Sequence, residues 1–202
     1  AQPDLMLDLA RPLNLPLAAH TPTQGALLLE EASVDLINAN NVLEHVPDLV
    51  SLMGNCLKLL KTGGEFHIEV PYEHARSAWQ DPTHVRALNE NSWLYYTDWF
   101  WYLGWYEHRF EMAASSYLDA RLQPCGREQA AFMRTTLRKI ETTPAERMHA
   151  QAMQAEVRLP AARQFIAEHR LNEVFEGTER DVGIIVQGGL YNNVLRALQV
   201  LG

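Results

Sequence analysis

The stretch "SVDLINANNVLEHVPDLVSLMGNCLKLLKTGGEFHIEVPYE", residues 33–73, constrains the fold more than any other part of the chain. It begins with a short apolar run between polar ends, which is typical of a buried parallel strand. Apolar residues then recur at helical spacing over residues 49–60, and Gly63-Gly64 is expected to end that helix. The run "EFHIEVP" alternates and ends at Pro71, as a second strand would. A strand–helix–strand unit of this length implies a right-handed crossover between parallel neighbours.

The rest of the chain extends this unit. Residues 72–110 are expected to form an excursion that holds all five Trp, and residues 93–106 alone carry half of the chain's aromatic residues. The runs "RFEMAASSYLDA" and "AAFMRTTLRKIE" predict two more strands. Beyond Thr143, helical segments precede a strand, a Gly-Gly turn and a helix. We predict an α/β, Rossmann-like, mostly parallel sheet with helices on both faces, in a domain of residues 1–143 followed by a segment of residues 144–202.

Composition excludes several classes of protein. The chain has 202 residues, 47% of them hydrophobic, and a net charge of −8, so it is globular and a poor match for nucleic acid, whose phosphates need a surplus of Lys and Arg. No run is apolar enough to span a membrane, and no signal peptide is visible. Cys56 and Cys125 are too few and too isolated for a disulfide framework or a metal site. We therefore expect a soluble, cytoplasmic protein without a bound metal.

Polar residues follow the ends of two predicted strands. Asp8 is expected to close a first strand, and Asn38, Ala39, Asn40 and Asn41 close the second. Ligands bind outside the carboxyl ends of the strands in sheets of this kind, so these residues are candidates for one ligand site. Asp8 could accept from an exocyclic amine, and the asparagines could bind a ribose or a carboxylate. Alternatively, Asp8 and Asn38 only cap loops and helix starts.

The segments "DLARPL", "NANNVLEHVPD" and "LLKTGGEFHIEVP" together resemble the second half of the class I S-adenosylmethionine-dependent methyltransferases. The segment "WQDPTHVRALNENSW" resembles a "DPTH" stretch that some members carry. The resemblance covers residues 3–141 and implies S-adenosylmethionine as cofactor and methyl transfer to a small-molecule acceptor. It also implies that Asp8, Leu9, residues 38–41 and His45 contact the cofactor. The family's glycine-rich first motif would lie before Asp8, where this sequence carries no such turn.

Two histidines are candidates for general-base catalysis near neutral pH. His84 is the stronger candidate, because Asp81 or Glu90 could orient its ring, and His45 follows the cofactor segment. Structural roles in a loop or a helix are the alternatives. Around them, the candidates for binding the acceptor are Tyr72, Glu73, His84, Asn89, Trp93 and Trp99.

The aromatic segment and the tail leave other functions open. The aromatic residues could pack as a core or lid, form a homo-oligomer interface, or line the acceptor pocket. A non-catalytic interaction protein that uses them as an interface is therefore a second hypothesis. Residues 157–202 resemble a stretch of the large subunit of indolepyruvate ferredoxin oxidoreductases, which implies a third, a fragment of a thiamine-diphosphate-dependent 2-oxoacid oxidoreductase. That family's cluster-binding cysteines are lacking in this sequence.

Overall fold

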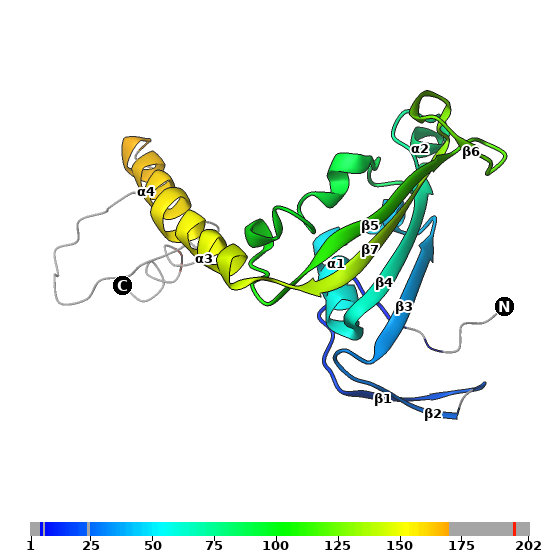
Figure 1. Ribbon diagram of the computed structural model, residues 1–202, viewed down its shortest axis with the longest axis horizontal. Coiled ribbons are helices and arrows are strands. Elements are labelled where there is room, and N and C mark those ends of the chain that lie inside the picture. Colours follow the sequence, from blue (N-terminus) through cyan, green and yellow to red (C-terminus); the bar gives the residue numbers. More distant parts are fainter. Residues whose placement is uncertain (1–4, 6, 24, 170–195, 197–202) are drawn as a thin grey trace. The chain divides into compact units, whose positions relative to one another are not determined.

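The computed structural model describes residues 5, 7–23, 25–169 and 196 (Figure 1). It divides into one unit from Ala1 to Val157 and a second from Arg158 to Gly202, of which residues 158–169 and 196 are described. The strand and Gly-Gly turn expected in the tail lie outside the described residues. The predicted division between residues 143 and 144 stays a prediction.

A five-stranded sheet forms the centre of the first unit, in the order β3-β4-β7-β5-β6. Its strands are β3 (Val34–Asn40), β4 (Leu60–Pro71), β5 (His108–Leu118), β6 (Pro124–Cys125) and β7 (Phe132–Glu141). Strands β3 and β4 pair in parallel, with Ile37 opposite Phe66 and Asn40 opposite Glu69. The α/β, Rossmann-like class and the parallel unit predicted over residues 33–73 are therefore confirmed.

The remaining pairings differ from the predicted, mostly parallel sheet. Strand β7 runs antiparallel to both β4 and β5, and β6 runs antiparallel to β5. The reason lies in the connection between β5 and β7, which contains only β6 and the short 3-10 turn η4 (Arg127–Gln129). A parallel pair needs a crossover, usually a helix, whereas a short reversal joins antiparallel strands.

Helix α1 (Leu49–Leu59) makes the crossover between β3 and β4. It begins at Asp48, whose carboxylate accepts hydrogen bonds from the Ser51 backbone N–H at 2.9 Å and the Ser51 hydroxyl at 2.7 Å. The first of these bonds satisfies a backbone donor that the first helical turn otherwise leaves free. The helix ends at Leu59, because Leu60 is already extended. The expectation that Gly63-Gly64 ends the helix is wrong: both glycines lie inside β4, where the register with β3 shifts between Val34 and Leu36.

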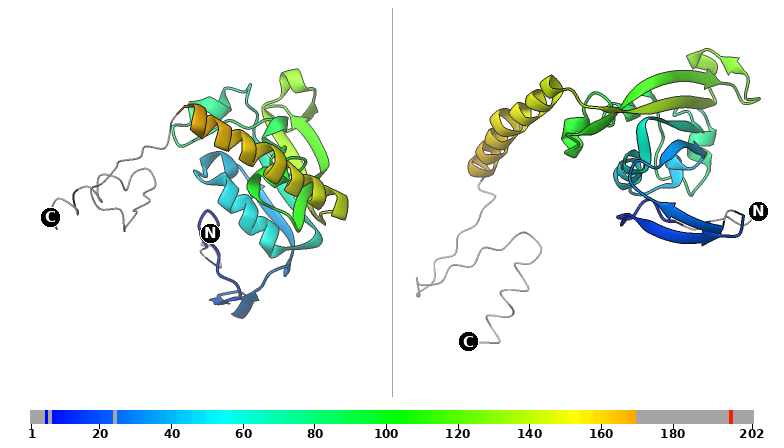
Figure 2. Two further views of the ribbon diagram at one scale, coloured as in Figure 1. Left: turned by 90° about the vertical axis from the view of Figure 1, so that its left-hand side faces the viewer. Right: turned by 60° about the horizontal axis from the view of Figure 1, so that its bottom comes forward.

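Helix α1 lies against one face of the sheet (Figure 2), and this face carries the core. Phe66, Ile68 and Val70 on β4 pack with Met133 and Leu137 of β7, and apolar residues of α1 complete the same cluster. The side chains on the other face of β4 and β7 are polar and partly exposed; among them are Glu65, His67, Arg134 and Arg138. In the described part of the chain, helices therefore cover one face of this sheet and not the predicted two.

Shorter elements surround the sheet. A separate antiparallel hairpin, β1 (Leu17–Thr21) and β2 (Gly25–Leu29), precedes β3 in the chain. The other elements are η1 (Leu43–His45), α2 (Ser77–Gln80), η2 (Glu90–Trp93), η3 (Phe100–Leu103), α3 (Pro144–Ala152), the π-helix η5 (Met153–Arg158) and, in the second unit, α4 (Leu159–Glu168). Among the described helices, none combines the length and the apolar character that a membrane crossing requires.

The aromatic segment serves both the core and the surface. Trp93, Tyr96 and Phe100 are buried, and Trp93 is fully enclosed. Tyr95, Trp99 and Tyr102 lie on the surface and contact one another edge to face or at a tilt, with ring centroids 5.3–6.3 Å apart. The prediction that these aromatic residues pack onto the sheet is confirmed for the first set only.

Candidate active site

The candidate site begins where β3 ends. Asn41 adopts a left-handed conformation with φ of 52°, and its backbone N–H donates to the carbonyl oxygen of Glu69 at 2.8 Å. Asn tolerates this conformation better than most residues, so the chain can turn sharply here. The turn leads into η1, where Leu43 is fully buried in the core and fixes the position of Glu44 and His45.

A second segment, residues 81–86, lies against η1. The Val85 N–H donates to the carbonyl oxygen of Glu44 at 2.8 Å. The Arg86 guanidinium donates to the carbonyl oxygens of Val46 and Pro47 at 2.7 and 2.6 Å. These bonds tie a loop that follows β4 to the loop that follows β3, as expected for parallel neighbours whose carboxyl ends share one edge.

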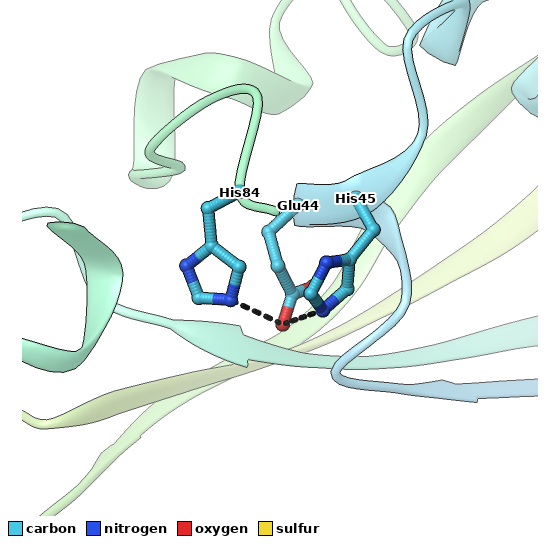
Figure 3. Close-up of side chains that lie close together, drawn as sticks. All are labelled: Glu44, His45 and His84. Atoms are coloured by element: carbon cyan, nitrogen blue, oxygen red, sulfur yellow. Dashed lines mark ion pairs between the residues drawn. The ribbon is translucent and has the colours of Figure 1, made fainter. Parts of the chain in front are cut away.

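The two segments bring Glu44, His45 and His84 together (Figure 3). The Nε2 atoms of His45 and His84 each lie 4.0 Å from Oε1 of Glu44. The two rings stand edge to face, with centroids 4.6 Å apart. The predicted candidates His45 and His84 are thus neighbours, although 39 positions separate them in the sequence.

Burial sets the electrostatics of this cluster. Glu44 is only 2% exposed, and burial raises the pKa of its carboxyl, while its own backbone amide and the His45 and His84 rings act in the opposite direction. Burial favours the neutral form of an acid, so the ionised form of Glu44 needs a positive partner. Asp81, at the surface, differs: hydrogen bonds from the Thr83 backbone N–H and hydroxyl lower the pKa of its carboxyl.

The predicted cofactor residues fall into two groups. Asn38, Ala39 and Asn40 lie at the end of β3 and His45 in η1, as expected. Asp8 does not close a strand, because neither it nor the described residues Leu5 and Leu7 pair with a strand. Instead its carboxylate accepts from the Ala10 N–H at 3.0 Å and pairs with Arg11 at 3.1 Å. The alternative prediction, that Asp8 caps a loop, fits this geometry.

Leu9 lies in the same loop, which is held against α1. The Asn55 side-chain amide donates to the carbonyl oxygens of Leu9 and Arg11 at 2.8 and 2.7 Å. The Leu9 side chain packs against the core. Leu9, which was predicted to contact the cofactor, is thus bonded through its carbonyl oxygen to α1, the helix between β3 and β4.

A polar hollow of about 300 Å³ lies on the uncovered face of the sheet, beside the end of β3. Its wall includes Asn38 and Asn40 from β3, His67 and Glu69 from β4, and Arg134 from β7. Arg134 donates to Glu69 at 2.6 Å, so an ion pair forms part of the wall. The role of Arg134 was not predicted from the sequence, because the antiparallel register that sets it opposite Glu69 could not be derived there.

The predicted acceptor residues do not form one surface. Tyr72 and Glu90 bond to each other, with the Tyr72 hydroxyl 3.1 Å from Oε1 of Glu90, and Tyr117 and Arg127 bond to the same carboxylate. The Asn89 amide donates to Glu73 at 2.7 Å beside this group. Of the two carboxylates predicted as alternatives to orient His84, Glu90 is thus taken up by other partners, and Asp81 lies beside the ring, with Oδ2 3.9 Å from Nε2.

The two tryptophans among these candidates lie in different environments. Trp93 belongs to the core, whereas Trp99 is 42% exposed. Trp93 therefore cannot offer its ring to an acceptor without opening the core. The prediction that Trp93 binds the acceptor is therefore corrected: Trp93 is a core residue. Spacing alone could not show this, because it does not reveal which residues of a dense aromatic run are buried.

Comparison with known proteins gives a match for the front of the chain. Residues 7–68 match the family described as Methyltransferase domain. Comparison with curated protein sequences gives no match. Several solved structures are similar to part of the chain.

The Burkholderia thailandensis 1,6-didemethyltoxoflavin-N1-methyltransferase is 19% identical, with a TM-score of 0.38 over 55% of this chain and 45% of that chain. A SAM-dependent methyltransferase from Archaeoglobus fulgidus is 14% identical, with a TM-score of 0.36 over 54% of this chain and 60% of that chain. The Haemonchus contortus phosphoethanolamine N-methyltransferase 1 is 13% identical, with a TM-score of 0.37 over 72% of this chain and 34% of that chain.

The chain thus spans between 34% and 60% of the length of these three proteins. None of the comparisons concerns the resemblance of residues 157–202 to an oxidoreductase subunit. Over residues 7–68, which run from the loop at Asp8 to β4, the chain carries the sequence pattern of a methyltransferase domain, and its predicted resemblance to the class I S-adenosylmethionine-dependent methyltransferases is confirmed there.

Proposed function

We propose that this chain takes part in the transfer of a methyl group from S-adenosylmethionine to a small-molecule acceptor. The observation that carries the proposal is the methyltransferase-domain match over residues 7–68, which covers β3, α1 and most of β4. The strands β3 and β4 are the parallel pair of the sheet, and ligands of such sheets bind beyond the carboxyl ends of the strands. Polar side chains gather at that edge.

The chemistry of the hollow at the end of β3 suits the cofactor. Asn38 and Asn40 are exposed there and offer both donors and acceptors, which ribose hydroxyls and a carboxylate require. A volume of about 300 Å³ is at the lower end of the range for small-molecule sites. Bound S-adenosylmethionine supplies a methyl group on a sulfonium, and the chain's residues would hold it in line with the acceptor.

The acceptor side would lie at the loops that follow the same strands. Glu73 and Asn89 bond to each other after β4, while His45 and His84 lie between the two loops. Methyl transfer depends mainly on in-line positioning, so a base on either histidine is needed only where the acceptor must lose a proton. We propose a small acceptor because the described polar groups at this edge are few and converge.

The proposal is tested by titrating S-adenosylhomocysteine into the full chain in a calorimeter. We expect saturable binding, which Asn40→Ala weakens about 5- to 100-fold, since a lost hydrogen bond to a ligand costs about 1–3 kcal/mol. Glu128→Ala changes an exposed residue in η4 and serves as the control. Absence of binding at millimolar S-adenosylhomocysteine, or equal weakening by both variants, would contradict the proposal.

A second candidate function rests on the exposed aromatic residues. Tyr95, Trp99 and Tyr102 form a contiguous surface cluster, and Trp and Tyr are favoured anchors of protein interfaces. We propose that this cluster joins two copies of the chain. Sedimentation should then show a concentration-dependent dimer that Trp99→Ala dissociates, whereas a monomer at all concentrations would refute it.

A further inference from the structure

We propose that Glu44, His45 and His84 form a binding site for one divalent transition-metal ion, with Zn²⁺ as the probe. The proposal does not depend on the proposed methyl transfer. The sequence predicts no metal site, because that expectation rested on the two isolated cysteines. The donors here are two imidazoles and a carboxylate, and residues from loops far apart in the sequence supply them.

The first argument is the isolation of the Glu44 carboxylate. Both of its oxygens are buried, and neither accepts a hydrogen bond of normal geometry from any group in the described part of the chain. Buried carboxylates are normally paired with a cation or hydrogen-bonded, because an unpaired charge in a protein interior is costly. The nearest atoms of opposite polarity that the fold supplies are the two histidine rings.

The second argument concerns which ring nitrogens carry hydrogen. Nδ1 of His84 lies 3.1 Å from the carbonyl oxygen of Ala78, and since a carbonyl only accepts, that nitrogen is the donor. The Thr83 hydroxyl donates its hydrogen to Asp81 at 2.7 Å, so it accepts from Nδ1 of His45 at 2.9 Å. In the neutral rings, Nε2 of both histidines therefore carries a free lone pair.

Both free lone pairs face an oxygen that can also only accept. The separations of 4.0 Å between each Nε2 and Oε1 of Glu44 exceed the length of a hydrogen bond, about 3.2 Å at most. Nε2 of His84 also lies 3.9 Å from Oδ2 of Asp81, a further oxygen that only accepts. The two Nε2 atoms and the Glu44 carboxylate oxygen thus face one another as electron-pair donors, and none of them carries a hydrogen. A metal ion requires such an arrangement.

The spacing fits an ion after a small contraction. Ligands at 2.1 Å from Zn²⁺ in a tetrahedral arrangement lie about 3.4 Å apart. The two separations from Glu44, at 4.0 Å, need to close by about half an ångström, and the two histidine nitrogens, within 4.8 Å of each other, by at most about 1.4 Å. The two imidazoles favour transition metals over Mg²⁺ and Ca²⁺, which prefer oxygen ligands. The three protein ligands leave at least one coordination position for a water molecule or an oxygen of another ligand.

The surroundings have the second set of contacts that metal sites use. A ligating histidine usually donates its other N–H to a carbonyl or carboxylate, which fixes the ring. His84 does so directly to Ala78, and His45 does so through Thr83 to Asp81. The His45 side chain is 37% exposed, so an ion can reach the cluster from solvent. With an ion bound, the histidines are ligands and not the proton acceptors that the sequence suggests.

The test is calorimetric titration of ZnCl₂ into the chelator-treated full chain, with metal analysis after equilibrium dialysis. We expect one Zn²⁺ per chain. His84→Ala and Glu44→Gln should each weaken the affinity about 100-fold or more, and Thr83→Val, which touches no metal, about 10- to 100-fold. His20→Ala is the matched control, since His20 is an exposed histidine of β1, and it should change the affinity less than about twofold.

Thermal unfolding gives a readout that separates loss of the site from loss of the fold. Without metal, Glu44→Gln should melt no earlier than the wild type, because it keeps the shape and removes a buried charge. Zn²⁺ at a hundredfold excess over its dissociation constant should raise the wild-type melting temperature by about 5–10 °C and leave Glu44→Gln unchanged. A wild type that binds no Zn²⁺, or a His20→Ala variant that loses as much affinity as His84→Ala, would overturn the proposal.

Discussion

The ammonium group of Lys139 donates a hydrogen bond to the backbone carbonyl oxygen of Leu60 across 2.7 Å, although Lys139 is only 5% exposed. Lys139 lies on β7, and Leu60 is the residue at which α1 gives way to β4. The bond ties the strand that runs antiparallel to β4 to the crossover of the parallel unit. Burial lowers the pKa of Lys139, with Glu31 acting in the opposite direction.

This lysine predicts how stability changes at alkaline pH. Its folded-state pKa lies below the unfolded value of about 10.4, so between the two the unfolded chain binds more protons and stability rises with pH. We expect the wild type to gain free energy of unfolding relative to Lys139→Met as the pH rises from 7 toward 10, measured by urea titration. Lys58→Met removes an exposed lysine and serves as the control. An equal gain relative to Lys58→Met would show that the effect does not come from the buried Lys139.

Gly63 and Gly64 should respond differently to the same substitutions. Gly63 has φ of 85°, and a side chain there would meet open space. Ala should lower the free energy of unfolding by about 1–2 kcal/mol, because this conformation is strained for it. Asn tolerates the conformation and should lower it less. At Gly64 a Cβ would lie 2.9 Å from the carbonyl oxygen of Lys61, so every side chain collides with backbone. Asn should be no better than Ala there, at a cost of about 1–3 kcal/mol. Urea titration of the four variants would reveal the contrast, and the same order at both positions would refute it.

The same glycines show where sequence reasoning stops. Residues 33–73 carry strong periodicities, so the parallel unit could be predicted from them. A Gly-Gly pair serves a helix end and an irregular strand equally well, because both need backbone freedom. Leu60 leaves the helix before the glycines, and its side chain is fully buried in the core, a placement that no local pattern reveals.

The candidate site was predictable only in part. His45 and His84 follow the ends of neighbouring strands, so their placement on one edge of the sheet could be inferred. That Glu44 turns inward and remains without a hydrogen-bond donor depends on the loop of residues 81–86, whose path is set by tertiary contacts such as those of Arg86. Trp93 and Trp99 carry the same side chain six positions apart, and only the fold separates core from surface.

The start of α3 predicts sensitivity to acid. The Thr143 side chain accepts from the Glu146 N–H at 3.2 Å, and Glu146 accepts from the Thr143 N–H at 2.7 Å and from Arg109 at 2.6 Å. Burial would raise the pKa of Glu146, but these bonds and the Arg109 charge lower it overall. Stability from this carboxylate is present above the unfolded pKa of about 4.3 and is lost as the pH falls below it.

We therefore expect Glu146→Gln to destabilise the chain at pH 7 and to differ less from the wild type at pH 3. Thr143→Ala should cost about 1 kcal/mol at pH 7, since it removes the cap alone. Chemical unfolding followed by circular dichroism measures both. A difference between wild type and Glu146→Gln that grows on acidification would show that the ion pair does not stabilise the fold.

The two thiols should differ in their reaction with a disulfide reagent. Cys56 is 1% exposed inside α1, and burial raises its pKa to about 12, whereas Cys125 in β6 is partly exposed. Thiolates are the reactive species, so at pH 8 Cys56 should react only as fast as the chain unfolds. In the Cys125→Ser variant, release of the coloured thiol should be slow in buffer and complete in denaturant, while Cys56→Ala retains the faster thiol. Rapid reaction of native Cys125→Ser would contradict the prediction and show that Cys56 becomes exposed by local opening, without unfolding of the whole chain.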